Sequence, residues 1–329
     1  MSPLASGRQP RTRQLLTAIF ALLLAVGLSG CQHKTPLPAT PFKASSYQLY
    51  YGHDAAELQR LQQDLQPGEL LILDSRKLSA TQLRALLDRA AERDARVIGY
   101  LSIGELDSRE KPAFDAFVAS LPAAERQAFE QVALEWNDKF ASWRIDVSAP
   151  VWQRWLRTQH EALVRQGLHG VFLDTPDTVD RYLTHPQWPR ATRIEKVQAM
   201  LAVIRSFKAE RPDDLILLNR GLNLIGEAVW LNEDGTDTLA GLALMRPHPH
   251  NPDIVLYENA YASDDPWTRR IEAELRATAA AGHTQVFTLG YRDTLGSAEQ
   301  LFTLSARDGF IAGFAESSTS LHQHGSERR

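Results

Sequence analysis

Gly170-Val-Phe-Leu-Asp174 is the stretch that decides the fold. Its three middle residues are apolar and consecutive, which is the pattern of a strand buried on both faces, as in a parallel sheet. The acidic residue Asp174 ends this apolar run. Seven other segments can be read as strands in the same way, and most of them are continuous apolar runs. The eight predicted strands are Tyr47–Tyr51, Leu70–Asp74, Val97–Ile103, Gly170–Asp174, Leu215–Asn219, Ile254–Tyr257, Gln285–Gly290 and Gly309–Phe314.

Amphipathic helices are expected between these strands, because apolar residues recur there at spacings of three and four. Leu58, Leu61 and Leu65 mark one helix, and Leu301 and Leu304 belong to the last. Strands alternating with helices predict an α/β protein, and eight strands predict a (β/α)8 TIM barrel. A doubly wound open sheet is the alternative, but no glycine-rich phosphate loop follows the first strand. We expect a single-domain barrel over residues 46–318 and a flexible tail at 319–329.

Residues 1–30 have the pattern of an export signal. Arg8, Arg11 and Arg13 precede the apolar run Leu15–Gly27, which at about 13 residues is too short for a good membrane span. Their removal would take away three of the 36 basic residues and none of the 40 acidic ones, since residues 1–30 contain no acid. The remaining body is acidic, so nucleic acid is not an expected partner.

Cys31 is the only cysteine, and it ends the motif Leu28-Ser-Gly-Cys31. This motif resembles the lipobox of bacterial lipoproteins. The resemblance implies cleavage before Cys31, lipidation of its sulfur and a membrane anchor of several acyl chains. Gln32 stands where an aspartate often retains lipoproteins in the inner membrane, so the outer membrane is expected. Residues 31–45 contain three prolines and are interpreted as an extended tether.

Carboxylates stand at the ends of several predicted strands. In a (β/α)8 barrel the carboxyl ends of the strands form the active site, so these side chains should meet on one rim. A single strand-end acid could merely cap a helix or pair with an arginine, but four acids that crowd together repel one another. The acids are Asp74, Glu105, Asp174 and Glu258, and the other residues expected to bind substrate on this rim are Tyr51, Asn219, Arg220 and Tyr291.

A pair of carboxylates is suited to glycosidic cleavage, in which one group protonates the leaving oxygen and the other attacks the sugar or activates water. A metal site is the main alternative, but no His-x-x-x-His accompanies the strand ends. His248 and His250 fall in a predicted loop. No Gly-x-Ser-x-Gly motif indicates a serine hydrolase. The sequence predicts no metal and no cofactor.

The chain resembles the TIM-barrel domain of glycoside hydrolase family 114, and the resemblance covers nearly the whole body from Tyr47 onward. It is carried by six short motifs in the same order: Tyr100-Leu-Ser-Ile-Gly-Glu105, Trp143-Arg-Ile-Asp-Val-Ser148 with Trp152, Gly170-Val-Phe-Leu-Asp174, Leu218-Asn-Arg-Gly221, Tyr257-Glu-Asn259 and Gly309-Phe-Ile. Members of this family are described as retaining endo-α-1,4-polygalactosaminidases.

The resemblance implies that Asp174 is the general acid/base and Glu258 the nucleophile. Asp74 and Glu105 are then expected to position the substrate or bind a cation. Because 38 residues separate Asn219 from Glu258 and include the pair Asn232-Glu233, Glu233 is the alternative partner of Asp174.

The sequence therefore predicts a monomeric outer-membrane lipoprotein with a polysaccharide substrate. The expected activity is retaining endo-hydrolysis of an α-1,4-linked, galactosamine-rich exopolysaccharide. A catalytically silent polysaccharide-binding lipoprotein, acting in matrix retention or export, is the alternative from another class.

Overall fold

The computed structural model describes residues 42–185, 187–226, 228–232, 234–240, 248–321 and 327–328. The predicted signal, Cys31 and the alternative partner Glu233 lie outside the described residues. Within them, no helix is both long and apolar enough to cross a membrane.

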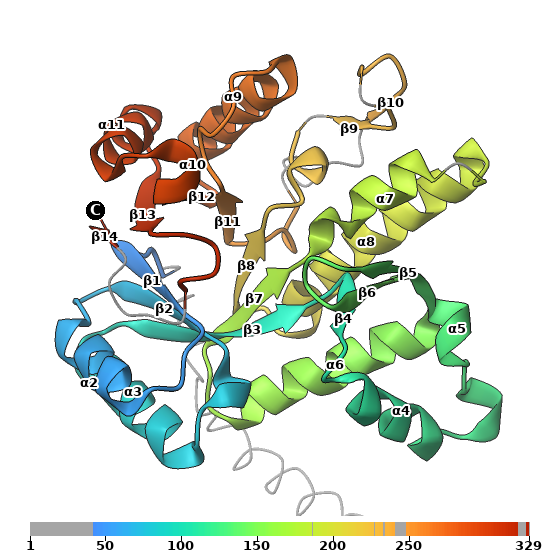
Figure 1. The fold of residues 1–329 in the computed structure, drawn as a ribbon, viewed down its shortest axis with the longest axis horizontal. Helices are drawn as coiled ribbons and strands as arrows, with labels where there is room; N and C mark the ends of the chain where they lie inside the picture. The colour runs from blue at the N-terminus through green and yellow to red at the C-terminus, as the bar shows by residue number, and fades with distance from the viewer. Residues whose placement is uncertain are drawn as a thin grey trace, which may run out of the picture. The chain divides into compact units, whose positions relative to one another are not determined.

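Eight parallel strands follow one another around a nearly closed barrel in chain order, so the predicted (β/α)8 fold is confirmed (Figure 1). Both faces of the strands are buried, as the continuous apolar runs predicted: Leu70, Leu71, Ile72 and Leu73 expose no surface. The strands are β1 (Ser46–Tyr50), β2 (Glu69–Leu73), β3 (Arg96–Ser102), β7 (Gly170–Asp174), β8 (Leu215–Asn219), β11 (Ile254–Glu258), β12 (Gln285–Tyr291) and β13 (Ile311–Ala315).

Helices between the strands lie on the outside of the barrel (Figure 1). Their ends follow from local sequence: Ser79 and Gln82 form a capping box at the start of α3, and Gly282 ends α9 with a φ of 74°. The helices are α2 (Ala55–Asp64), α3 (Ala80–Glu92), α4 (Lys111–Ser120), α5 (Phe129–Val132), α6 (Pro150–Arg165), α7 (Val179–Thr184), α8 (Arg190–Glu210), α9 (Pro266–Ala281), α10 (Arg292–Leu295) and α11 (Ala298–Asp308).

The seam between β13 and β1 is bridged by a side chain. Tyr47 of β1 stacks on Phe287 of β12 with ring centroids 4.7 Å apart, and its hydroxyl donates to the carbonyl of Thr288 at 2.7 Å. A short strand, β14 (Glu327–Arg328), pairs antiparallel with β13. Tyr47 thus joins β1 to β12 past the intervening strand β13.

Two small antiparallel sheets were not predicted. The first is inserted after β3 and consists of β4 (Glu105–Asp107), β6 (Ser142–Ile145) and β5 (Ala133–Asn137), in the order β4–β6–β5. The second is the hairpin of β9 (Ala228–Trp230) and β10 (Thr238–Ala240). It lies in the long connection from β8 to β11, which has no α-helix among its described residues.

Candidate active site

Asp174 and Glu258 meet across the side-chain amide of Asn219. Nδ2 of Asn219 donates to Oδ1 of Asp174 at 2.8 Å and to Oε2 of Glu258 at 2.8 Å. The two carboxylate oxygens therefore cannot be farther apart than twice 2.8 Å. The three residues end β7, β8 and β11, which are neighbours in the sheet, so their carboxyl ends lie side by side.

Each of these carboxylates also accepts a bond from a tyrosine. Tyr100 of β3 donates its hydroxyl to Oδ2 of Asp174 at 2.7 Å, and Tyr291 of β12 donates to Oε1 of Glu258 at 2.7 Å. Tyr51, just after β1, packs edge-on against Tyr100 with ring centroids 5.3 Å apart. The structure thus brings Tyr51 and Tyr291 to the pair.

The carboxyl group of Asp174 has a raised pKa. Burial and the negative charge of Glu258 raise its pKa to about 6, although hydrogen bonds from Tyr100 and Asn219 oppose the rise. A carboxyl group with this pKa holds its proton in weakly acidic solution, which is the property required of a general acid.

Arg220 supplies positive charge beside the pair. Its Nε lies 3.5 Å from Oδ2 of Asp177, and its side chain is about half exposed. Burial opposes its charge, but the carboxylates of Asp177 and Glu258 outweigh that effect and raise its pKa. The guanidinium is thus a permanent cation near the two carboxylates.

The residues that follow the three site residues share an unusual backbone conformation. Thr175, Arg220 and Asn259 have φ values of 62°, 60° and 57°. Non-glycine residues rarely adopt this left-handed region, and a β-branched residue such as Thr175 does so least readily. The chain therefore turns sharply directly after Asp174, Asn219 and Glu258, and the strain lies at the site.

The carboxylate of Asp74 is engaged by neighbouring basic side chains. Its Oδ1 accepts from Arg76 at 2.7 Å and its Oδ2 lies 3.3 Å from Lys77. Burial would raise the pKa of Asp74, but the pairing with Arg76 outweighs it and lowers the pKa. Where the sequence predicted a substrate contact, the structure places an ion pair between the buried Asp74 and the exposed Arg76. The pair holds Arg76 over the ring of Tyr100, 5.2 Å from its centroid.

The carboxylate of Glu105 is also engaged by hydrogen-bond and ion-pair partners. It is buried in the β4–β6–β5 sheet, where Asn137 donates to it at 3.0 Å, Ser142 donates to its other oxygen, and Arg144 lies 3.5 Å away. This carboxylate holds the inserted sheet together instead of facing a substrate, because every partner comes from β5 or β6.

Asn219 lies deeper than predicted for a substrate-binding residue. Only 5% of it is exposed, and its Oδ1 is buried without a hydrogen-bond partner. Its position between the carboxylates is that of a support. Tyr100 was the residue that sequence reasoning did not assign to the site. It could have been found from strand alternation, because Tyr100 and Ser102 point to the same face of β3 and Ser102 pairs with Asp174.

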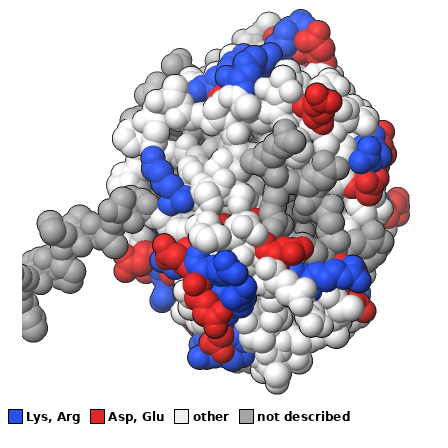
Figure 2. Space-filling view, turned by 90° about the vertical axis from the view of Figure 1, so that its left-hand side faces the viewer, with Lys and Arg blue, Asp and Glu red and all other residues white. Residues whose placement is uncertain are grey.

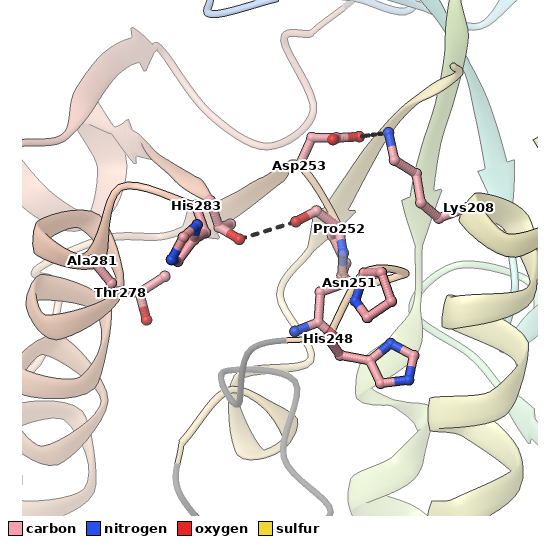
Figure 3. A pocket seen from close by; sticks show the side chains of 10 residues that line it. Lys208, His248, Asn251, Pro252, Asp253, Thr278, Ala281 and His283 are labelled. Atoms are coloured by element: carbon pink, nitrogen blue, oxygen red, sulfur yellow. Dashed lines mark hydrogen bonds and ion pairs between the residues drawn. The ribbon is translucent and has the colours of Figure 1, made fainter. Parts of the chain in front are cut away.

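A separate cleft of about 420 Å³ lies at the opposite end of the barrel (Figure 3). It is lined by residues that precede β11 and β12, among them Asp253 and Thr284. Asp253 is paired with Lys208 at 2.8 Å, and His248 lies exposed at the edge of the chain's described part. The cleft has no second carboxylate among its lining residues, so it lacks the paired acids of the rim.

In the described part of the chain, no group of three histidine, cysteine, aspartate or glutamate side chains is placed to hold a metal ion. On the face shown in Figure 2, basic and acidic side chains lie next to one another around a hollowed region. The paired carboxylates of β7 and β11 are therefore the best candidate for chemistry.

Comparison with known proteins gives structural neighbours only. No protein-family model matches the chain, and no curated protein matches its sequence. The glycoside hydrolase domain of PelA from Pseudomonas aeruginosa is similar in structure, with 19% identity, a TM-score of 0.56, and coverage of 85% of this chain and 97% of that one. The complex of Aspergillus fumigatus Ega3 with galactosamine has 14% identity, a TM-score of 0.53, and coverage of 90% and 99%. At such identities the likeness shows a shared fold.

Proposed function

We propose that this protein is a retaining glycoside hydrolase that cleaves internal glycosidic bonds of a galactosamine-rich polysaccharide. The observation that carries the proposal is the bridge of Asn219 to both Asp174 and Glu258 at 2.8 Å. Retaining enzymes hold their two carboxyl groups about 5 to 5.5 Å apart, and inverting enzymes hold them roughly 6.5 to 9.5 Å apart. A single amide that contacts both groups fits the shorter separation.

The two carboxylates have environments suited to different roles. Asp174, with its pKa raised to about 6 by burial and by Glu258, is the general acid that protonates the leaving oxygen. Glu258 accepts hydrogen bonds on both oxygens, from Asn219 and Tyr291, and lies near the positive charge of Arg220. Glu258 is therefore the nucleophile that forms the glycosyl ester, and Asp174 then takes a proton from the water that hydrolyses it.

The substrate class is supported by charge and by the similar structures. One neighbour is a glycoside hydrolase domain and another was determined with galactosamine. A protonated amino sugar would be attracted by the acidic side chains of Glu258 and Asp177, and the Asp177 side chain is about one-third exposed. The proposed location is the outer membrane, through a lipid on Cys31.

The test is to replace each acid by its amide. Asp174→Asn and Glu258→Gln should each lower the rate at which new reducing ends appear from the polymer by about a hundredfold or more. Asp88→Asn and Glu161→Gln are matched controls, because both residues are exposed on outer helices. Thermal unfolding would establish that all four variants fold. Cleavage at the wild-type rate by both site variants would exclude the proposal.

Azide separates the two roles. With Glu258→Ala, azide should replace the lost nucleophile and give a glycosyl azide of inverted configuration. With Asp174→Ala, azide should attack the glycosyl ester and give a glycosyl azide of retained configuration. The opposite pattern would exchange the roles, and wild-type protein that binds the polymer without cleaving it would identify a silent polysaccharide-binding protein.

A further inference from the structure

The amide of Asn219 uses both of its N–H groups on the carboxylates. Nδ2 has two hydrogens and two acceptors at 2.8 Å, Oδ1 of Asp174 and Oε2 of Glu258. Oδ1 of Asn219 is buried with no partner. The amide therefore donates a hydrogen bond to each acid while its own carbonyl oxygen has no hydrogen-bond partner.

This orientation of the amide is strongly preferred over its flipped form. Flipping would place Oδ1 of Asn219 within 2.8 Å of two carboxylate oxygens, so that lone pairs would face lone pairs. A hydrogen bond to a charged group is stronger than one between neutral groups, and the amide of Asn219 makes two of them. Two such bonds outweigh the single unsatisfied oxygen.

We propose that Asn219 is a positioning residue that determines which oxygen of Asp174 carries the proton. Because an N–H group of Asn219 already occupies Oδ1, the proton resides on Oδ2. This inference deepens the proposed function, and its catalytic consequence rests on that function: the acid delivers its proton from one defined atom.

Tyr100 completes the arrangement, since its hydroxyl lies 2.7 Å from Oδ2 of Asp174. A tyrosine hydroxyl both donates and accepts. While Asp174 is protonated, Tyr100 accepts from Oδ2–H. When the proton passes from Oδ2 to the glycosidic oxygen, the C–O bond breaks with its electron pair on that oxygen, Glu258 bonds to the sugar carbon, and Tyr100 turns to donate to the new carboxylate. Attack by water on that carbon returns a proton to Oδ2 and frees Glu258.

Several charged or titratable groups surround Asp174 and would contribute to its titration. They come from the ends of the neighbouring strands, and they affect the pKa of Asp174 whether or not Asn219 is present. These groups are Tyr51, Tyr100 with Arg76 and Asp74 behind it, Asp177, Arg220, Glu258 and Tyr291. A test must therefore compare variants at Asn219 alone.

The first experiment observes the proton directly by NMR on the full-length protein. Both Nδ2 protons of Asn219 should resonate far downfield and should stay there as Asp174 is protonated below about pH 6. If the proton were on Oδ1 instead, the N–H facing Asp174 would lose its acceptor and move upfield. That upfield movement would overturn the proposal without any measurement of activity.

The same titration is repeated on Asn219→Leu, which keeps a similar volume but has no donor. Loss of a donor to the charged form should move the Asp174 midpoint to higher pH by about half a unit or more. Asn219→Ala should move it in the same direction if the leucine variant folds poorly. Asn223→Leu is the control, because Asn223 is buried nearby and bonds only to the backbone of Trp230. An unchanged midpoint in both Asn219 variants would contradict the proposal.

The second experiment compares two leaving groups. Asn219→Leu should lower kcat/KM about tenfold or more on a galactosamine oligosaccharide, whose leaving oxygen needs a proton, and by less than about threefold on the glycosyl fluoride. Equal losses on both substrates would indicate a merely structural residue and would overturn the proposal. If wild-type protein cleaved neither substrate, the proposed function would fail, while the NMR titration would still decide where the proton lies.

Discussion

At the scale of single residues, the carboxyl group of Asp174 determines how activity should depend on pH. Its pKa is raised to about 6 by burial and by the charge of Glu258. Since the general acid must be protonated, kcat/KM should fall about tenfold for each pH unit above about 6. Initial rates from pH 4 to 9 would measure this. Asp88→Asn should give the same profile, and a rate that stays level to pH 8 would contradict the role of Asp174.

The same raised pKa affects stability. Between pH 3.8 and about 6 the folded protein keeps a proton on Asp174 that the unfolded chain has lost, so the free energy of unfolding falls as pH rises through this window. Asn cannot ionise. The melting temperature of Asp174→Asn relative to wild type should therefore increase from pH 4 to pH 7, by the equivalent of about 1 to 3 kcal/mol.

The control for this second effect is Asp88→Asn on α3, whose melting temperature should keep a constant difference from wild type. A constant difference for Asp174→Asn would show that the folded and unfolded pKa values of Asp174 are alike. Because the expected gain in stability accompanies a loss of catalysis, the two measurements together separate the acid's chemical role from a structural one.

Which site residues could be predicted depended on where their partners lie in the chain. The sequence could place Asp174 and Glu258 on the same rim because each stands at the end of a buried strand. The partners of Asp74 follow within three residues, so its pairing with Arg76 and Lys77 was open to prediction. The partners of Glu105 come 32 to 39 residues later, in strands that the sequence did not suggest. The bridge made by Asn219 depends on where its amide lies between two side chains of neighbouring strands, which a strand pattern in the sequence does not give.

At the scale of elements, the eight barrel strands were predicted to within two residues at each end, because continuous apolar runs bounded by polar residues are distinctive. The inserted β4–β6–β5 sheet was missed. Its strands are three to five residues long and mix polar with apolar side chains, as in Ser142-Trp-Arg-Ile145. Segments so short have little periodicity, and their pairing depends on contacts between distant parts of the chain.

The turn after β3 should be intolerant of even one added carbon. A Cβ on Gly104 would lie 2.2 Å from the carbonyl oxygen of Thr175, whose own hydroxyl accepts from the Gly104 N–H at 2.9 Å. Gly104→Ala should therefore destabilise the fold by about 1 to 3 kcal/mol and displace Thr175, which directly follows Asp174. Urea unfolding and kcat/KM would measure the two effects.

Gly282→Asn is the comparison for that change. Gly282 ends α9 with a φ of 74° and has no atom within 4 Å of an added Cβ, and asparagine tolerates this backbone region. It should leave kcat/KM unchanged and alter stability only slightly. Wild-type stability and rate in Gly104→Ala would show that the turn adjusts more freely than its contacts indicate.

At the scale of the whole molecule, strand order was predictable because each strand lies beside the next one in the chain. Closure of the barrel at Tyr47 was not, because a contact between β1 and β12 leaves no local pattern. The connection from β8 to β11 also departs from strict alternation, with the β9–β10 hairpin among its described residues in place of a helix. From the sequence, only the 38 residues between Asn219 and Glu258 indicated that this connection is longer than an ordinary strand-to-strand connection.

Membrane attachment is a prediction about the whole molecule that rests on Cys31, outside the described residues. Cys31→Ser should abolish incorporation of labelled palmitate and move the protein out of the membrane fraction, because serine offers no sulfur for the lipid. Cell fractionation with labelling would measure this. Gln32→Ala should stay in the membrane fraction, and continued labelling of Cys31→Ser would rule out this lipidation site.

The two ends of the barrel have different neighbours. The chain enters β1 at the amino ends of the strands, whereas Asp174 and Glu258 lie at the carboxyl ends, about 17 Å away along five residues of strand. A substrate that reaches Asp174 and Glu258 therefore approaches the barrel from the end opposite to the one at which the chain enters β1.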